Sequence, residues 1–296
     1  MPVAAAALVA IAALAVSAFS DSPKPLRVAT HSAGRPRVIV TPAPGAGAAW
    51  TPVARVDGQV AAWISLRGGV TLMLLDQRLV RLDLHAGSLD GGVSGWTYGD
   101  QITRSEIHEI VAAFNGGFKL SYLHTGFESA GHVASPIRPG LASIVTYTDG
   151  STAIATWGNG VPSARKHVYS VLQNQFLLVD RGHAAATVSN CIISCWGATI
   201  QGLTIVARSA LGIDSSGRLV WAAGEHLTPA QLAAGLIAGG AVRALELDIN
   251  PDWVDGYLYV HHAPGPTAVP VVPGQLGIAG EFRAPYTRDF LTVVAN

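Results

Sequence analysis

The stretch Ala241–Tyr259, AVRALELDINPDWVDGYLY, carries Glu246, Asp248 and Asn250 at alternate positions of a predicted strand. Side chains alternate between the two faces of a strand, so these three polar groups face one side and the apolar residues between them face the other. Pro251 then closes the strand. Because a carboxylate is costly to bury unless it binds or reacts with something, we predict an interior strand that ends in a pocket.

A helix is predicted directly before this strand. Thr228 suits the cap position, Pro229 suits the first helical position, and Gly239-Gly240 ends the apolar run between them. Apolar stretches also flank turn sequences at 141–158 and 205–224, a pattern typical of β-hairpins.

Short apolar runs separated by turn residues predict further strands. VAAWISL, VTLMLLD and LVRLDLH favour consecutive antiparallel strands from about Val60, and DFLTVVAN favours a final strand at the C-terminus. We therefore predict the α+β class, with a mixed, largely antiparallel sheet built from hairpins and a few packed helices in a single domain.

Two further polar motifs lie on predicted strands. Arg208 stands among small residues and needs an anionic partner, either an internal carboxylate or a bound anion such as phosphate. Asn115, Gly116 and Gly117 end an apolar strand, where glycines let a ligand approach the backbone and leave amides free to donate; a plain turn is the alternative. The loop at 119–140 resembles a binding loop or lid, with polar candidates Lys119, His124, Glu128, His132 and Arg138.

Composition and the N-terminus indicate where the chain works. The 296 residues include 19 basic and 19 acidic side chains, so nothing favours nucleic acid as a partner. Residues 1–20 form an uncharged apolar run, which predicts a signal peptide or an N-terminal membrane anchor and hence an extracytoplasmic protein. Residues 21–55 are rich in proline, alanine and glycine and predict a lead-in, with the folded domain at 56–296.

The chain has two cysteines, Cys191 and Cys195. Their spacing is too wide for a CxxC redox motif, and there is no second pair to complete a zinc site. In an oxidising compartment they would form a local disulfide; two reduced, packed cysteines are the alternative.

Five segments in this order resemble the phosphodiester glycosidase family: AAFNGGFK, LQNQFLLVDRG, CWGAT, RSALGIDSSGRLVWAAG and LTPAQLAAGLIAGGAVRALELDINPDW. The resemblance implies a secreted or luminal hydrolase of sugar-1-phosphodiesters, with a catalytic domain of mixed, largely antiparallel sheet. By position, Asn115, Gly116 and Gly117 match the family's Asn-Gly-Gly loop, Arg208 its arginine, and Asp248 the aspartate of its Leu-Asp-Gly-Gly loop. Ile249 and Asn250 replace the two glycines of that loop, which predicts a stiffer loop and a narrower pocket.

From this resemblance we expect Arg208 to hold the phosphate and Asp248 to act as nucleophile or base, with Glu246 as the second carboxylate. Asn115, the Gly116 and Gly117 amides, Asn174 and Asn250 are the predicted substrate-binding groups. The expected partner is a phosphorylated sugar or polysaccharide of the cell envelope.

Two alternatives remain open. The pocket could bind a phosphosugar or cell-envelope polysaccharide without cleaving it. The oxygen atoms of Glu246, Asp248, Asn250 and Asp252 could also hold Ca²⁺ or Mg²⁺, since hard cations prefer such ligands.

Overall fold

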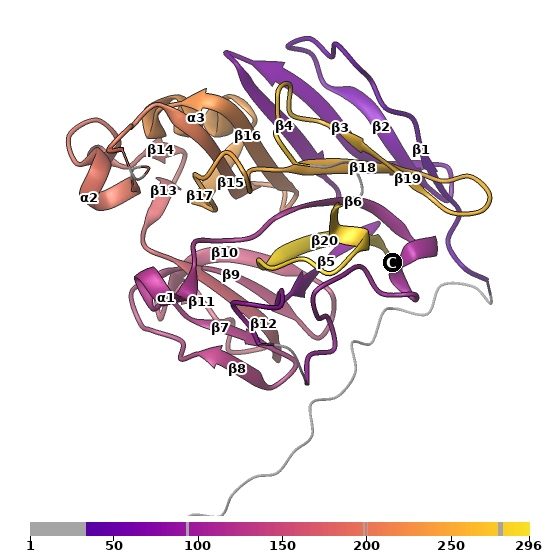
Figure 1. Cartoon of the computed structure of the whole chain (residues 1–296), viewed down its shortest axis with the longest axis horizontal. Helices are drawn as coiled ribbons and strands as arrows, with labels where there is room; N and C mark the ends of the chain where they lie inside the picture. Colours follow the sequence, from indigo (N-terminus) through magenta and orange to yellow (C-terminus); the bar gives the residue numbers. More distant parts are fainter. Residues whose placement is uncertain (1–33, 93–94, 198, 200, 278–280) are drawn as a thin grey trace, which may run out of the picture.

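Antiparallel strands dominate the computed structural model, which describes residues 34–92, 95–197, 199, 201–277 and 281–296 (Figure 1). They form three sheets of nine, six and five strands. The largest sheet has the order β1 (Val38–Val40), β2 (Thr51–Val56), β3 (Gln59–Arg67), β4 (Val70–Leu75), β16 (Leu219–Leu227), β15 (Val206–Asp214), β17 (Ala241–Glu246), β13 (Leu177–Asp180), β14 (His183–Ala184).

The two smaller sheets lie against it. The six-stranded sheet has the order β11 (Gly160–Val161), β10 (Thr152–Trp157), β9 (Ala142–Tyr147), β12 (Val168–Asn174), β7 (Phe127–Ser129), β8 (His132–Ser135). The five-stranded sheet has the order β19 (Thr267–Pro270), β18 (Gly256–Val260), β6 (Ile110–Asn115), β20 (Phe290–Ala295), β5 (Val80–His85). One apolar core contains buried residues from all three sheets, including Met73, Phe114 and Leu172.

Helices are few among the described residues. They are α1 (Leu120–Leu123), α2 (Ile192–Trp196), α3 (Pro229–Ala238) and three short 3₁₀ turns, η1 (Glu106–His108), η2 (Ala186–Val188) and η3 (Glu281–Arg283). The predicted α+β class was therefore wrong: the fold is β-rich. Its sheets bury their apolar faces mainly against one another, which leaves little surface for helices to cover.

The longest helix of the described ranges, α3, forms where the sequence predicts it. The Thr228 hydroxyl accepts from the Gln231 amide at 3.2 Å, while the Gln231 side chain accepts from the Thr228 amide at 2.9 Å. Helix α3 packs Leu232 and Leu236 onto the face of the large sheet opposite the shared core. This capped helix delivers the chain into β17.

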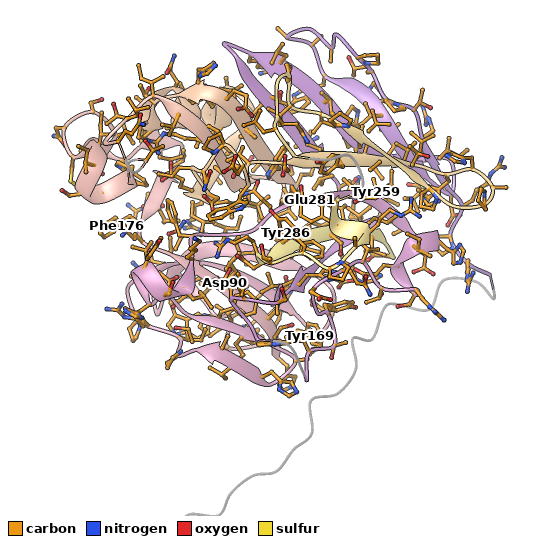
Figure 2. The ribbon with its side chains drawn as sticks, viewed as in Figure 1. Asp90, Tyr169, Phe176, Tyr259, Glu281 and Tyr286 are labelled. Atoms are coloured by element: carbon orange, nitrogen blue, oxygen red, sulfur yellow. A yellow bond between two sulfur atoms is a disulfide. The ribbon has the colours of Figure 1, made fainter. Side chains whose placement is uncertain are left out.

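The two predicted hairpins are confirmed as β9–β10 and β15–β16. The prediction that LVRLDLH continues the meander was wrong, because β5 pairs with β20 in the five-stranded sheet. In that region Tyr259 and Tyr286 belong to one buried cluster (Figure 2), in which the Tyr286 ring lies 5.0 Å from the Phe282 ring between centroids. Strand β20 confirms the predicted C-terminal strand.

The N-terminal boundary also differs from the prediction. Regular structure begins at β1 rather than near Val60, because β1 and β2 extend the large sheet from within the stretch expected to be a lead-in. The predicted signal peptide or anchor at 1–20 lies outside the described residues. Within the described part of the chain, the helices are too short to cross a membrane.

Candidate active site

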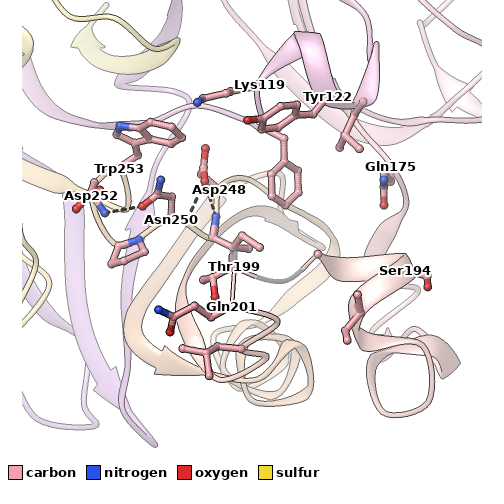
Figure 3. Close-up of a pocket in the computed structure, with 17 residues that line it drawn as sticks. Lys119, Tyr122, Gln175, Ser194, Thr199, Gln201, Asp248, Asn250, Asp252 and Trp253 are labelled. Carbon is pink, nitrogen blue, oxygen red and sulfur yellow. Dashed lines mark hydrogen bonds between the residues drawn. The ribbon is translucent and has the colours of Figure 1, made fainter.

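Strand β17 ends at Glu246, four residues before the end of the predicted strand. The chain continues beside β15, where the Leu247 amide donates to the Ser209 carbonyl at 2.8 Å and the Ser209 amide donates to the Asp248 carbonyl at 2.9 Å. From Asp248 onward the chain borders a cavity of about 700 Å³ (Figure 3). Strict alternation beyond Glu246 is therefore lost, and Glu246 and Asp248 have different surroundings.

The cavity lies mainly between three parts of the chain, and Gln175 also lines it. One is the loop after β17, the second is α1 with the residues before it, and the third runs from α2 toward β15. Its lining is largely apolar and includes Phe118, Tyr122, Leu123, Ile193, Leu203, Ile249, Pro251 and Trp253. The charged residues that line it are Lys119, Asp248 and Asp252. A cavity of this size and character suits a small organic ligand.

Asp248 is 4% exposed and lines this cavity. Its Oδ1 accepts from the backbone amides of Ile249 at 2.7 Å and Asn250 at 2.9 Å, which fixes the carboxylate plane. Its Oδ2 lies 3.5 Å from Nη2 of Arg288. Burial raises the pKa of Asp248, and the nearby Arg288 charge opposes that rise. The prediction that Asp248 borders a pocket is confirmed.

Arg288 is a site residue that the sequence reasoning missed. It is buried, pairs with Asp90, donates to the Gly117 carbonyl at 2.8 Å, and lies 4.8 Å from the centre of the Trp253 ring. It precedes the predicted strand DFLTVVAN, and a basic residue immediately before a buried strand is the signal that would have drawn attention to it.

Lys119 supplies a cation to the cavity. Its Nζ lies 4.4 Å from the centre of the Trp253 ring and 5.4 Å from that of Tyr122, within the range of cation–π attraction. In Figure 3 the Asp248 carboxylate points toward the side of the cavity where Lys119, Tyr122 and Trp253 lie. The cavity thus has an ammonium group, two aromatic rings and a carboxylate on one side.

Arg208 does not reach the cavity, which corrects its predicted role in holding phosphate. It is fully buried, and its Nη1 donates to Glu246 Oε1 at 2.6 Å. The remaining N–H groups donate to backbone carbonyls, those of Leu227, Trp196, Gly197 and Thr204. All five N–H groups are therefore used within the protein, and the internal carboxylate is the partner. The guanidinium fixes the segment that forms one wall of the cavity.

Glu246 is the partner of Arg208 and does not line the cavity, so its predicted role as a second catalytic carboxylate is corrected as well. Burial raises its pKa to about 7, with the Arg208 charge opposing this shift. Glu246 does not reach the cavity because β17 ends at this residue and its side chain is buried inside the sheet layer.

The Asn115-Gly116-Gly117 motif is also internal. The Gly116 and Gly117 amides donate to the backbone carbonyl and to Oδ2 of Asp289, at 2.9 and 2.8 Å. The Asn115 side chain donates to Ser209 Oγ at 2.8 Å. These groups therefore bind protein rather than ligand. A Cβ at Gly116 would lie 2.0 Å from Asp289 Oδ2, so glycine is required there by the close approach of this carboxylate.

Of the two other predicted binding residues, one binds the protein itself and one lines the cavity. Asn174 is buried and donates to the Glu246 and Leu247 carbonyls at 2.5 and 3.1 Å, so it holds the end of β17 instead of a ligand. Asn250 lines the cavity, and its Oδ1 accepts from the Asp252 amide at 3.0 Å. Of the predicted lid residues, Lys119 lines the cavity. The prediction that 119–140 is a binding loop or lid was otherwise wrong, because much of this segment forms α1, β7 and β8.

Cys191 and Cys195 form a disulfide, which confirms the first of the two alternatives. The bond joins the residue before α2 to a residue within it, and α2 contributes Ile193 and Ser194 to the cavity. The described ranges contain no group of three or more histidine, cysteine, aspartate or glutamate side chains placed to hold a metal ion. Binding of Ca²⁺ or Mg²⁺ stays a prediction that the structure does not test.

No family model and no curated protein sequence matches this chain. Among solved structures, the chain is similar to the catalytic domain of zebrafish N-acetylglucosamine-1-phosphodiester alpha-N-acetylglucosaminidase, auto-inhibited by its pro-peptide. Identity is 12% over 91% of this chain and 86% of that one, with a TM-score of 0.48. A hypothetical protein from Synechocystis is 13% identical over 82% of this chain and 66% of that one, with a TM-score of 0.40. These are distant structural similarities, and neither assigns an activity to this chain.

Proposed function

We propose that this protein is an extracytoplasmic glycosidase that hydrolyses a sugar-1-phosphodiester, with Asp248 as nucleophile or base. The proposal is supported by one observation above all: Asp248 is a buried carboxylate, held by two backbone amides, on the wall of a large cavity that also contains an ammonium group. The sequence resemblance to phosphodiester glycosidases points to the same aspartate.

In this reaction the bond between C1 of the sugar and the phosphate oxygen breaks, and the phosphomonoester leaves with the electron pair. Water supplies the new hydroxyl on C1, either directly, with Asp248 accepting its proton, or after Asp248 has bonded to C1. Because Oδ1 accepts two amide hydrogen bonds, Oδ2 is the oxygen better placed to react. Phosphate is a good leaving group, so holding its charge matters more than protonating it.

Lys119 takes the role that Arg208 was predicted to have. It lines the cavity, whereas all the N–H groups of Arg208 are used inside the protein. An ammonium group between two aromatic rings is partly desolvated, which strengthens its attraction for a phosphate. Asn250 is the remaining predicted binding residue that lines the cavity.

The extracytoplasmic location has two lines of support. A disulfide joins Cys191 and Cys195, and such bonds persist in oxidising compartments. The apolar, uncharged run at 1–20 is typical of a signal peptide or anchor.

The test compares Asp248→Asn with Asp252→Asn on a panel of sugar-1-phosphodiesters. Both aspartates line the cavity, but Asp252 is exposed. We expect Asp248→Asn to lower kcat by about 10²- to 10⁴-fold, because the amide can still accept the two backbone hydrogen bonds but can act neither as base nor as nucleophile. Asp252→Asn should remain near wild type. Equal activity of wild type and Asp248→Asn would overturn the proposal.

Binding without cleavage is the second candidate. It is favoured by the position of Glu246, whose pairing with Arg208 leaves Asp248 without the second carboxylate that the glycosidase mechanism was expected to use. Tight binding of several sugar-1-phosphodiesters with no turnover by wild type would support this alternative.

A further inference from the structure

The apolar part of the cavity continues out onto the protein surface. Tyr122 is 74% exposed, Ile193 60% and Leu203 54%, and all three line the cavity. They come from three separate segments, α1, α2 and the residues before β15. Large apolar side chains that gather at the mouth of a cavity mark a binding surface, because soluble proteins seldom expose them together.

The structure also fixes the backbone near two of these side chains. The Cys191–Cys195 disulfide closes the helical turn that carries Ile193. Arg208 donates to the carbonyls of Gly197 and Thr204, on either side of Leu203 in the sequence. Fixing exposed apolar groups in advance lowers the entropy lost when a ligand covers them. The wall is therefore suited to contact an apolar ligand group.

The positions of the charged residues determine how such a ligand is oriented in the cavity. Lys119 lies against the Trp253 ring, whereas Ser194 and Gln201 lie on another side of the cavity (Figure 3). Ile193 and Leu203 line the cavity from the same two segments as Ser194 and Gln201. An anionic group held by Lys119 can thus have its reacting sugar carbon at Asp248 and a substituent that runs along the apolar wall. A volume of about 700 Å³ exceeds what a single sugar phosphate needs, so the cavity has room for such a substituent.

We infer that the alcohol on the far side of the phosphodiester is apolar, an alkyl or prenyl chain that lies along Ile193 and Leu203. This inference rests on the proposed function, since it names the second alcohol of the same substrate. It commits to a lipid-like ester because Ile193 and Leu203 are large, exposed apolar side chains of this wall. Ser194, Thr199 and Gln201 of the same segments also line the cavity, so a second sugar bound by these polar groups is the alternative that the experiment tests.

The experiment measures binding separately from cleavage, with methyl, butyl and octyl phosphate as probes in titration calorimetry of the full chain. We expect the Kd to fall about tenfold or more from methyl to octyl phosphate, because each buried methylene contributes to affinity. The double variant Ile193→Ser/Leu203→Ser should lose this dependence on chain length and keep the wild-type Kd for methyl phosphate. Leu276→Ser is the matched control, since Leu276 is 62% exposed and does not line the cavity.

A Kd independent of chain length would overturn the inference, whether or not sugar-1-phosphodiesters are cleaved. The same holds if the double variant keeps the dependence. If the wall instead pairs two copies of the chain, sedimentation would show a dimer that Leu203→Ser dissociates, with no effect of chain length on binding. Chain-length dependence without turnover of any sugar-1-phosphodiester would support the apolar site and refute the hydrolase, so the two proposals fail separately.

Discussion

The wall of the cavity and the polar residues beneath it use similar side chains for different purposes. We call Asn115, Asn174, Arg208, Glu246 and Asp289 the buried polar layer. Its members donate to and accept from each other's strands, and none of them lines the cavity. In the wall, Lys119 contacts aromatic rings and Asp248 faces open space. A polar residue at a strand end is therefore informative about ligands only when its side chain borders open space, as that of Asp248 does.

The comparison predicts that the buried polar layer governs stability. Arg208→Ala should lower the free energy of unfolding by about 3–5 kcal/mol, because it leaves Glu246 and several carbonyls buried without partners. Urea denaturation measures this. Arg243→Ala removes an exposed ion pair between β17 and Asp180 of the neighbouring strand β13, and it should cost less than about 1 kcal/mol. If Arg208→Ala lowers the free energy of unfolding as little as Arg243→Ala does, the buried polar layer does not stabilise the fold.

The double variant Arg208→Met/Glu246→Leu tests whether the stability lost in Arg208→Ala comes from the unpaired Glu246 carboxylate. Replacing both charges by apolar groups should recover part of the stability lost in Arg208→Ala, since no buried charge is left unpaired. If the double variant recovers none of this stability, the hydrogen bonds from Arg208 to backbone carbonyls contribute more to the free energy of unfolding than its ion pair with Glu246 does.

A second prediction concerns pH. Burial raises the pKa of Asp289 to about 7, and burial together with the Glu281 charge raises that of Asp255 to about 7. Between about pH 4 and 7 the folded protein therefore binds more protons than the unfolded chain, so stability falls as pH rises through this window. We expect the free energy of unfolding to be higher at pH 5 than at pH 8, by about 2 to 3 kcal/mol for each of the two groups.

The variant Asp289→Asn measures how much of this pH dependence of stability comes from Asp289. The amide oxygen can still accept from Gly117, so this variant should show a weaker pH dependence and a higher stability at pH 8. Asp252→Asn, at an exposed position, should keep the wild-type profile. Stability that rises from pH 5 to pH 8 would contradict the assignment of raised pKa values.

The smallest expected effect concerns the cation in the wall. Lys119→Met should raise the KM for a sugar-1-phosphodiester about tenfold, or about 1.4 kcal/mol, and leave the melting temperature nearly unchanged. Lys166→Met is the matched control, because Lys166 also lies over an aromatic ring, that of Tyr147, but outside the cavity. Equal kinetics in both variants would exclude Lys119 from substrate binding.

Local sequence patterns predicted much of the framework. The Thr228 cap, the β9–β10 and β15–β16 hairpins and the final strand follow from nearest-neighbour preferences and confirm their predictions. The partner of β5 could not be predicted, because strand pairing between distant segments depends on which apolar faces meet. The same limit explains the missed β1 and β2, whose residues join a sheet edge despite proline and glycine nearby.

The sequence by itself determined that Asp248 follows an apolar strand and that Lys119 follows the Asn-Gly-Gly turn, since both depend only on local order along the chain. The tertiary structure decided which charges meet. It placed Arg208 with Glu246 inside the sheet layer and brought Arg288 to Asp248 from 40 positions away. Side-chain partners across strands depend on register and on where a strand ends, and neither property is encoded in the alternation of one stretch.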